Sequence, residues 1–108
     1  MAVPSVGKDL SVVLLLDYYG GLLPEKQRRL VEYYYCDDLS LSEITDNENI
    51  TRQGARDAIV RAVSKLKKYE ESVGLIAKAS SVKELLSAYL KSGDDDDFRS
   101  LCEAIDNM

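Results

Sequence analysis

Apolar residues recur at spacings of three and four along most of the chain, which is the period of an amphipathic α-helix. The pattern is clearest in one stripe of seven residues: Ala55, Ile59, Ala62, Val63, Leu66, Tyr69 and Val73. The chain has only two prolines, and it lacks the alternating runs of Val, Ile and Thr that are typical of strands. The sequence therefore predicts an all-α protein.

Breakers and capping residues divide this pattern into five to six helices. Gly20-Gly21 ends the first of them, and Pro24 suits the first turn of the second, where its missing N–H is no loss. Gly74 and Gly93 are expected to end two later helices. The first four helices are expected over residues 8–19, 24–36, 40–47 and 52–73, where residue 40 is the N-cap of the third. The fifth is expected to begin at residue 75 or at residue 81 and to end at residue 90. The last is expected over residues 95–105.

The residues around the third and fourth helices predict a helix-turn-helix. Ser40 followed by Glu43 is the capping-box pattern. Asn49 stands where the turn needs a left-handed residue, and Thr51 is a suitable N-cap for the fourth helix. We expect residues 1–78 to form the helix-turn-helix domain, with residues 79–108 as a C-terminal helical extension packed on the same domain.

Charge is distributed unevenly along the chain. The formal net charge is −5, which argues against a protein that coats nucleic acid without specificity. Residues 37–49 hold five acids and no base, whereas residues 51–69 hold six bases and one acid. Arg61, Lys65 and Lys68 are predicted to project from the polar side of the fourth helix, with Arg56 and Lys67 on its flank.

No catalytic, cofactor or metal motif is found in the sequence. There is no histidine, there are two cysteines far apart, and no glycine-rich nucleotide loop occurs. Asp94–Asp97 is interpreted as a helix start, because a cation site needs oxygen ligands spread around a loop. We therefore expect no enzyme, no cofactor and no metal, and reduced thiols at Cys36 and Cys102.

The N-terminal apolar run covers only Val12–Leu16 before Asp17 interrupts it. This run is shorter than the apolar part of a signal peptide and far too short to cross a bilayer. We expect a cytoplasmic protein without membrane insertion.

The helix-turn-helix suggests a candidate nucleic-acid surface. In such a motif the start of the second helix touches base edges, which here means Thr51, Arg52, Gln53 and Arg56. Arg61, Lys65 and Lys68 are the candidates for phosphate contacts. The alternative is that Arg52 and Arg56 are simply solvated or form ion pairs with the acidic third helix. Tyr33–Tyr35 could likewise stack on bases or pack in the core.

Residues Leu22–Leu75 resemble region 4 of bacterial sigma factors, and Leu14–Lys78 resemble the YlxM family more closely. Four segments carry this second resemblance: "LLLDYYGGLLPEKQ", "YYYCDDLSLSEI", "ITRQGARDAIVRA" and "LKKYEESVGLIAK". The matching motif positions are Ser40, Glu43, Ile44, Ile50, Thr51, Arg52 and Gln53. The sequence departs from the pattern at Thr45, at Glu48, where a buried Leu or Phe is usual, and at Gly54.

The resemblance implies a cytoplasmic helical protein that regulates or assists the signal recognition particle pathway, since the family's genes lie beside those of the particle's GTPase or its receptor. The implied partners are components of the particle, either the GTPase or the RNA, and no catalytic residues are implied. A sequence-specific DNA-binding regulator is the second interpretation. A helical dimerisation module is the third, since a two-fold homodimer is a common arrangement for a small helical protein.

Overall fold

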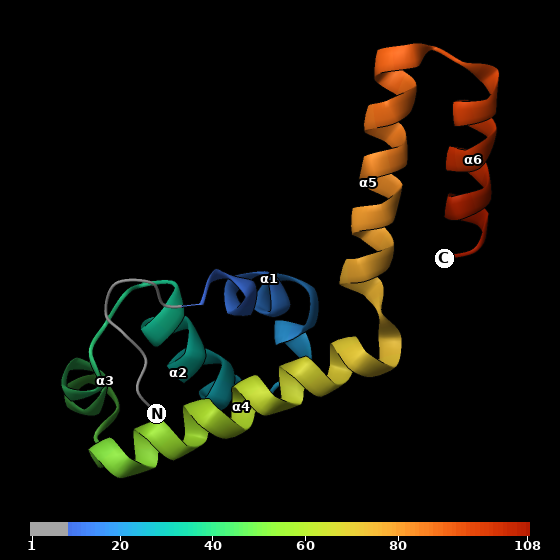
Figure 1. Cartoon of the computed structure of the whole chain (residues 1–108). Helices are drawn as coiled ribbons and strands as arrows, with labels where there is room; N and C mark the ends of the chain where they lie inside the picture. The colour runs from blue at the N-terminus through green and yellow to red at the C-terminus, as the bar shows by residue number, and fades with distance from the viewer. Residues whose placement is uncertain (1–8) are drawn as a thin grey trace. The chain divides into compact units, whose positions relative to one another are not determined.

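The computed structural model describes residues 9–108, and all regular structure in this range is helical (Figure 1). The elements are α1 (Leu10–Tyr19), the 3₁₀ turn η1 (Gly20–Leu22), α2 (Glu25–Tyr35), α3 (Leu41–Glu48), α4 (Arg52–Val73), α5 (Leu75–Ser92) and α6 (Asp95–Asp106). The predicted all-α class is confirmed, and α4 has the predicted bounds. The expected start of the first helix at Lys8 lies outside the described residues.

Two predicted helix boundaries need correction. Pro24 is the N-cap of α2 and not its first helical residue, so α2 begins at Glu25 and ends before Cys36. Of the two expected starts for α5 the earlier one is correct, and α5 continues past Leu90 to Ser92.

The chain divides into two compact units, one reaching Ser72 and the other covering Val73–Met108. Gly74 lies at this division and adopts a left-handed conformation with φ of 67° between α4 and α5. The sequence placed the boundary after Lys78, which lies inside α5. We call the first unit the helix-turn-helix unit and the second the C-terminal hairpin. That residues 79–108 pack on the first unit stays a prediction.

The helix-turn-helix unit has a continuous apolar core to which α1–α4 all contribute. α4 lies along one side of α1, α2 and α3 (Figure 1). Five residues of its predicted stripe are buried, whereas Tyr69 is half-buried and Val73 is exposed. The other buried apolar residues in this unit are Val12, Leu15, Leu16, Tyr19, Leu23, Leu30, Val31, Tyr34 and Ile44.

Contacts between α1 and the far end of α4 extend this packing beyond the aliphatic core. The Tyr19 hydroxyl donates a hydrogen bond to Glu70 at 2.5 Å, and the rings of Tyr19 and Tyr69 lie 6.1 Å apart. Contacts to the rest of the unit therefore continue along α4 as far as Glu70.

The caps around the turn are those the sequence predicted. The Glu43 N–H donates to Ser40 Oγ and the Ser40 N–H donates to Glu43 Oε1, both at 3.1 Å. Asn49 is left-handed, with φ of 53°. Thr51 Oγ1 accepts from the Gly54 N–H at 2.9 Å. These local hydrogen bonds fix where α3 begins and ends and where α4 begins.

The C-terminal hairpin consists of α5 and α6, two antiparallel helices joined at Gly93-Asp94 (Figure 1). Gly93 ends α5 with φ of 65°, and Asp94 caps α6 by accepting from the Asp96 N–H at 3.0 Å. The run of aspartates is therefore a helix start, as predicted. No cluster of side chains suited to a metal ion occurs within residues 9–108.

None of the helices in the described range combines the length and the apolar character needed to cross a bilayer.

Candidate nucleic-acid interface

The first turn of α4 exposes the residues that the sequence proposed as base contacts. Thr51, Arg52 and Gln53 are all exposed, while Ile50 is half-buried in the turn before them. The Thr51 hydroxyl is engaged as the helix cap. Arg52 therefore presents the most accessible charged group at this end of the helix.

Asp57 holds two of the four candidate base-contacting residues. The Gln53 side-chain amide donates to Asp57 Oδ1 at 2.9 Å, and the Arg56 guanidinium lies 3.4 Å from the same oxygen. Arg56 is thus paired within its own helix and not with α3. A base edge would have to compete with the Asp57 carboxylate for both side chains.

Glu48, at the end of α3, binds across to α2. Its Oε1 lies 2.8 Å from Arg29 Nη2 and its Oε2 lies 3.3 Å from Arg29 Nε, so the contact is two-pronged. The Tyr33 hydroxyl is 3.5 Å from Oε2, and only 11% of the Glu48 side chain is exposed. The hydrogen bond from Arg29 lowers the pKa of Glu48, and the hydrogen bond to Glu48 raises the pKa of Arg29.

This ion pair explains how an acid occupies a position where the resemblance led us to expect a buried Leu or Phe. The stem of Glu48 is covered and its charge is matched by Arg29. Glu43 is engaged in the capping box. Of the three α3 acids that could repel a polyanion, only Asp46 makes no side-chain hydrogen bond or ion pair within the described residues.

Three cations form a row along α4, which we call the basic row: Arg61, Lys65 and Lys68. All three are exposed, whereas Ala62, Val63 and Leu66 between them are buried, so the row lies away from the core. Seven helical residues separate its ends, a distance of about 10 Å along the axis. Lys65 Nζ donates to Gln27 Oε1 of α2 at 3.3 Å. The row therefore borders α2 on one side.

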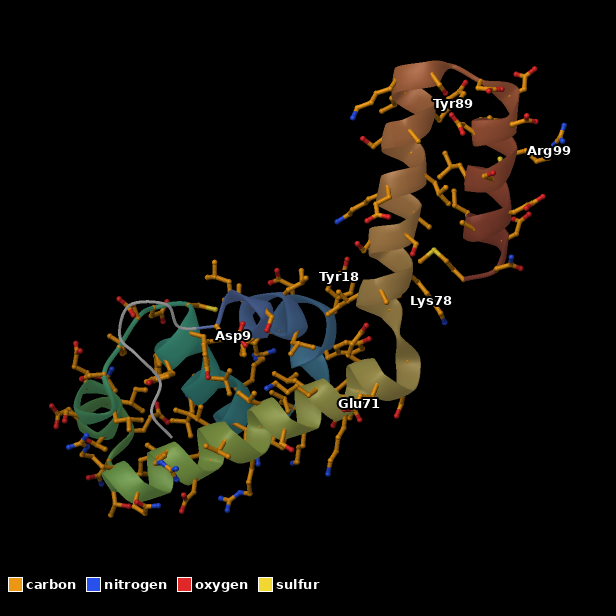
Figure 2. The ribbon with its side chains drawn as sticks, viewed as in Figure 1. Asp9, Tyr18, Glu71, Lys78, Tyr89 and Arg99 are labelled. Carbon is orange, nitrogen blue, oxygen red and sulfur yellow. The ribbon has the colours of Figure 1, made fainter. Side chains whose placement is uncertain are left out.

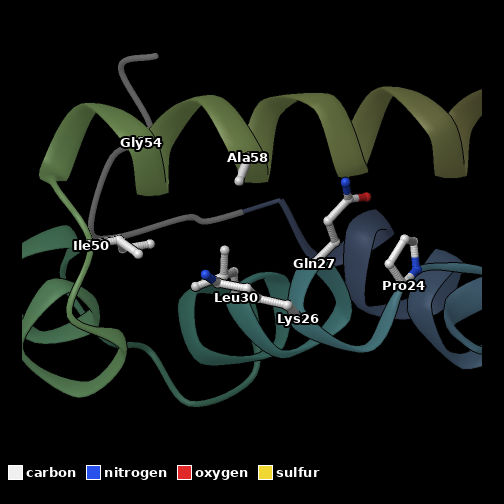
Figure 3. A pocket seen from close by; sticks show the side chains of 7 residues that line it. All are labelled: Pro24, Lys26, Gln27, Leu30, Ile50, Gly54 and Ala58. Atoms are coloured by element: carbon white, nitrogen blue, oxygen red, sulfur yellow. The ribbon is translucent and has the colours of Figure 1, made fainter.

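An apolar groove lies between α2 and α4 (Figure 3), and Gln27, one of its lining residues, accepts the hydrogen bond from Lys65 of the basic row. It has a volume of about 360 Å³ and is lined by Pro24, Lys26, Gln27, Leu30, Ile50, Gly54 and Ala58. A Cβ at position 54 would lie 3.0 Å from Thr51 Oγ1, so glycine leaves room there for the capping hydroxyl. The sequence analysis missed the groove. The small residues Gly54 and Ala58, four positions apart, are the signal that could have indicated it.

The three consecutive tyrosines mainly pack inside the unit. Tyr34 is buried, Tyr33 and Tyr35 are half-buried, and the Tyr34 and Tyr35 rings meet edge to face at 5.1 Å. The Tyr33 hydroxyl is directed to Glu48. This arrangement favours the core-packing interpretation over a base-stacking surface.

A family model described as "Putative helix-turn-helix protein, YlxM / p13 like" matches residues 6–105 of the chain. The chain belongs to this family, UPF0122. The resemblance to YlxM proteins drawn from the four sequence segments is thereby confirmed. The family description also agrees with a helix-turn-helix built from α3 and α4, and such a scaffold is typical of binding proteins.

Named relatives agree with this assignment. The UPF0122 protein of Shouchella clausii is 38% identical over 98 residues, covering 91% of this chain and 90% of the relative. That of Halalkalibacterium halodurans is 36% identical over 105 residues, covering 94% and 96%. That of Desulforamulus reducens is 51% identical over 67 residues, covering 62% of this chain and 57% of that relative, which is less than two thirds of its length. These names state no ligand.

Proposed function

We propose that this UPF0122 protein is a non-enzymatic regulatory or accessory factor of the signal recognition particle pathway, acting in the cytoplasm by binding. In this proposal the basic row of α4 contacts the phosphate backbone of the particle's RNA. Membership of a helix-turn-helix family and the resemblance to YlxM proteins support a binding role. The pathway itself rests on the resemblance.

The observation that carries the RNA contact is the exposure of Arg61, Lys65 and Lys68 on a protein of net charge −5. An exposed row of cations concentrates anionic ligands locally, even when the whole protein is acidic. Of the nearby α3 acids, Glu48 adds little opposing charge because it is paired with Arg29, whereas Glu43 and Asp46 keep theirs. Spaced cations without a set of free base-reading side chains favour phosphate contacts over sequence readout.

Sequence-specific DNA binding is the second candidate, and exposed Arg52 and Gln53 favour it. Asp57 weighs against it, because its carboxylate accepts from Gln53 and pairs with Arg56. Base readout by these residues would require both contacts to be exchanged for contacts to a base.

The test is a charge reversal of the basic row, Arg61→Glu, Lys65→Glu and Lys68→Glu together. Binding to the particle's RNA is followed by fluorescence anisotropy in graded salt, and co-purification with the particle is measured in cells. We expect loss of co-purification. Each single reversal should remove one phosphate contact. The slope of log K against log salt concentration should then become shallower by about one unit.

The matched control reverses three exposed cations of α5, namely Lys78→Glu, Lys83→Glu and Lys91→Glu, which changes the net charge by the same amount. Unchanged binding by the basic-row variant, or equal loss in both variants, would contradict the proposal. Tight binding to one duplex DNA sequence, lost on Arg52→Ala, would favour the DNA-binding alternative instead.

A further inference from the structure

The C-terminal hairpin has almost no core of its own. Leu101 is the one buried residue among residues 73–108, all of which the structure describes. In the same segment Leu86, Leu90, Phe98 and Ile105 are between 41% and 73% exposed. Two helices that leave so much apolar surface uncovered need a further layer to pack against.

The positions of these side chains follow from the way the two helices face each other. Leu85 and Tyr89 of α5 and Ala104 of α6 are half-buried, and Leu101 of α6 is buried. We infer from this burial that these four side chains lie between the two helices. The Tyr89 and Phe98 rings meet at 5.3 Å, and Figure 2 shows Tyr89 directed toward α6 while Arg99 points away from α5.

Each exposed apolar residue comes directly after a buried or half-buried residue in the sequence. Leu86 comes after Leu85, for example, and Ile105 comes after Ala104. One step along a helix is a turn of about 100°. Because α5 and α6 run in opposite directions, that turn leads to the same side of the pair in both helices. We call this side the hairpin face, and it comprises Leu86, Leu90, Phe98, Cys102 and Ile105.

The hairpin face is large enough to form an interface. An aromatic side chain buries roughly 150–250 Å², and we take about 200 Å² as an upper value for each large apolar residue of the face. At the observed exposures the face then offers on the order of 450 Å² per molecule. Two such faces in contact would bury about 900 Å² before the polar rim is counted, close to the roughly 1,000 Å² of the smallest specific interfaces.

We propose that the hairpin face binds the hairpin face of a second copy of this chain, so that two hairpins form a four-helix bundle. A segment of fewer than roughly 40 residues seldom folds without a metal, disulfides or association. No disulfide is present, since Cys36 and Cys102 are both free. A two-fold axis places the same patch on both molecules, and none of the five residues of the face is charged, so self-contact brings no like charges together.

The first test is the molar mass of the full chain by sedimentation equilibrium over a range of concentrations. We expect twice the 12.1 kDa of the monomer at the high end. The double variant Leu90→Glu/Phe98→Glu should remain at the monomer mass. The matched control is Leu10→Glu/Leu22→Glu, which charges two exposed leucines of the other unit and should leave the dimer intact. A monomeric wild type, or a hairpin variant that still dimerises, would overturn the proposal.

A second measurement needs no substitution and therefore does not depend on how the variants fold. Cys102 lies within the hairpin face, whereas Cys36 is an exposed thiol of the other unit. Alkylation of Cys102 by iodoacetamide should slow several-fold as the protein concentration rises through the dimerisation range, with the Cys36 rate unchanged. A Cys102 rate independent of concentration would mean that the face is not covered by a second copy.

Discussion

The two units of this protein contain helices of similar length and different burial. α4 of the helix-turn-helix unit and α5 of the hairpin each show apolar residues at spacings of three and four, yet α4 contributes five buried residues and α5 contributes none. The difference lies in what covers the apolar side chains within each unit: α4 lies along α1, α2 and α3, whereas within the hairpin α5 pairs with α6 alone (Figure 1). An amphipathic stripe predicts a helix, and the number of neighbouring layers decides whether its apolar side is buried.

The comparison has a functional counterpart. The helix-turn-helix unit buries most of its apolar side chains, although Leu10 and Leu22 are exposed, and it presents cations on its surface in the basic row. The hairpin leaves apolar surface outside. We therefore expect the first unit to meet a polyanion and the second to meet another apolar surface.

The largest expected effect comes from matched truncations in the two units. Leu66→Ala removes a fully buried side chain from the core of the helix-turn-helix unit and should lower the free energy of unfolding by about 2–5 kcal/mol. Leu101→Ala, the same change in the hairpin, should cost clearly less in dilute protein. Urea unfolding combined with hydrogen exchange, which reports on each unit, measures both losses. Equal losses would mean that the hairpin has a core comparable to that of the first unit.

A smaller effect is expected at the start of α3. Ser40→Ala removes one half of the capping box and should lower the free energy of unfolding by about 1 kcal/mol, because the Glu43 N–H loses its acceptor. Ser42→Ala is the control, since it lies exposed in the same first turn and makes no cap. Urea midpoints of the two variants compared with the wild type check this. Equal destabilisation of the two variants would mean that the capping box does not contribute to stability.

The smallest effect is a pH dependence at the Arg29–Glu48 pair. Because the folded state lowers the pKa of Glu48 below its ordinary value of 4.5, the pair stabilises the fold fully above pH 4.5. That stabilisation is lost as the pH falls through the folded pKa. Glu48→Gln should therefore be less stable than the wild type at neutral pH, and the difference should shrink well below pH 4.5. The urea midpoints of both proteins, with Asp46→Asn as the exposed-acid control, provide the measurement. If the difference in stability between Glu48→Gln and the wild type did not change with pH, the charge of Glu48 would not be its cause.

Much of the helix-turn-helix could be predicted from sequence because the interactions that define it are local. The Ser40–Glu43 capping box, the Thr51 cap and left-handed Asn49 join residues within a few positions of one another. The α4 stripe is likewise a property of one continuous segment. Such features can be recognised in a single sequence without knowing the tertiary packing.

What could not be predicted depends on contacts between distant segments. Arg29 and Glu48 belong to different helices, and their ion pair becomes evident only once α2 and α3 are packed. The groove beside the basic row likewise needs α2 and α4 together. The Gln53–Asp57 hydrogen bond is different, since its spacing of four residues was visible in the sequence and was overlooked. The hairpin face could not be recognised before the antiparallel pairing of α5 and α6 was known.

The Arg29–Glu48 contact also bears on how the family can vary. If the glutamate alone became leucine, the Arg29 guanidinium would keep only its longer contact to exposed Glu25, at 3.7 Å. If the arginine alone were lost, the largely covered carboxylate of Glu48 would lose its counter-charge. Substitutions at these two positions should therefore be coupled across UPF0122 proteins. Relatives with an aliphatic or aromatic residue at the end of the third helix should lack a basic partner in the second.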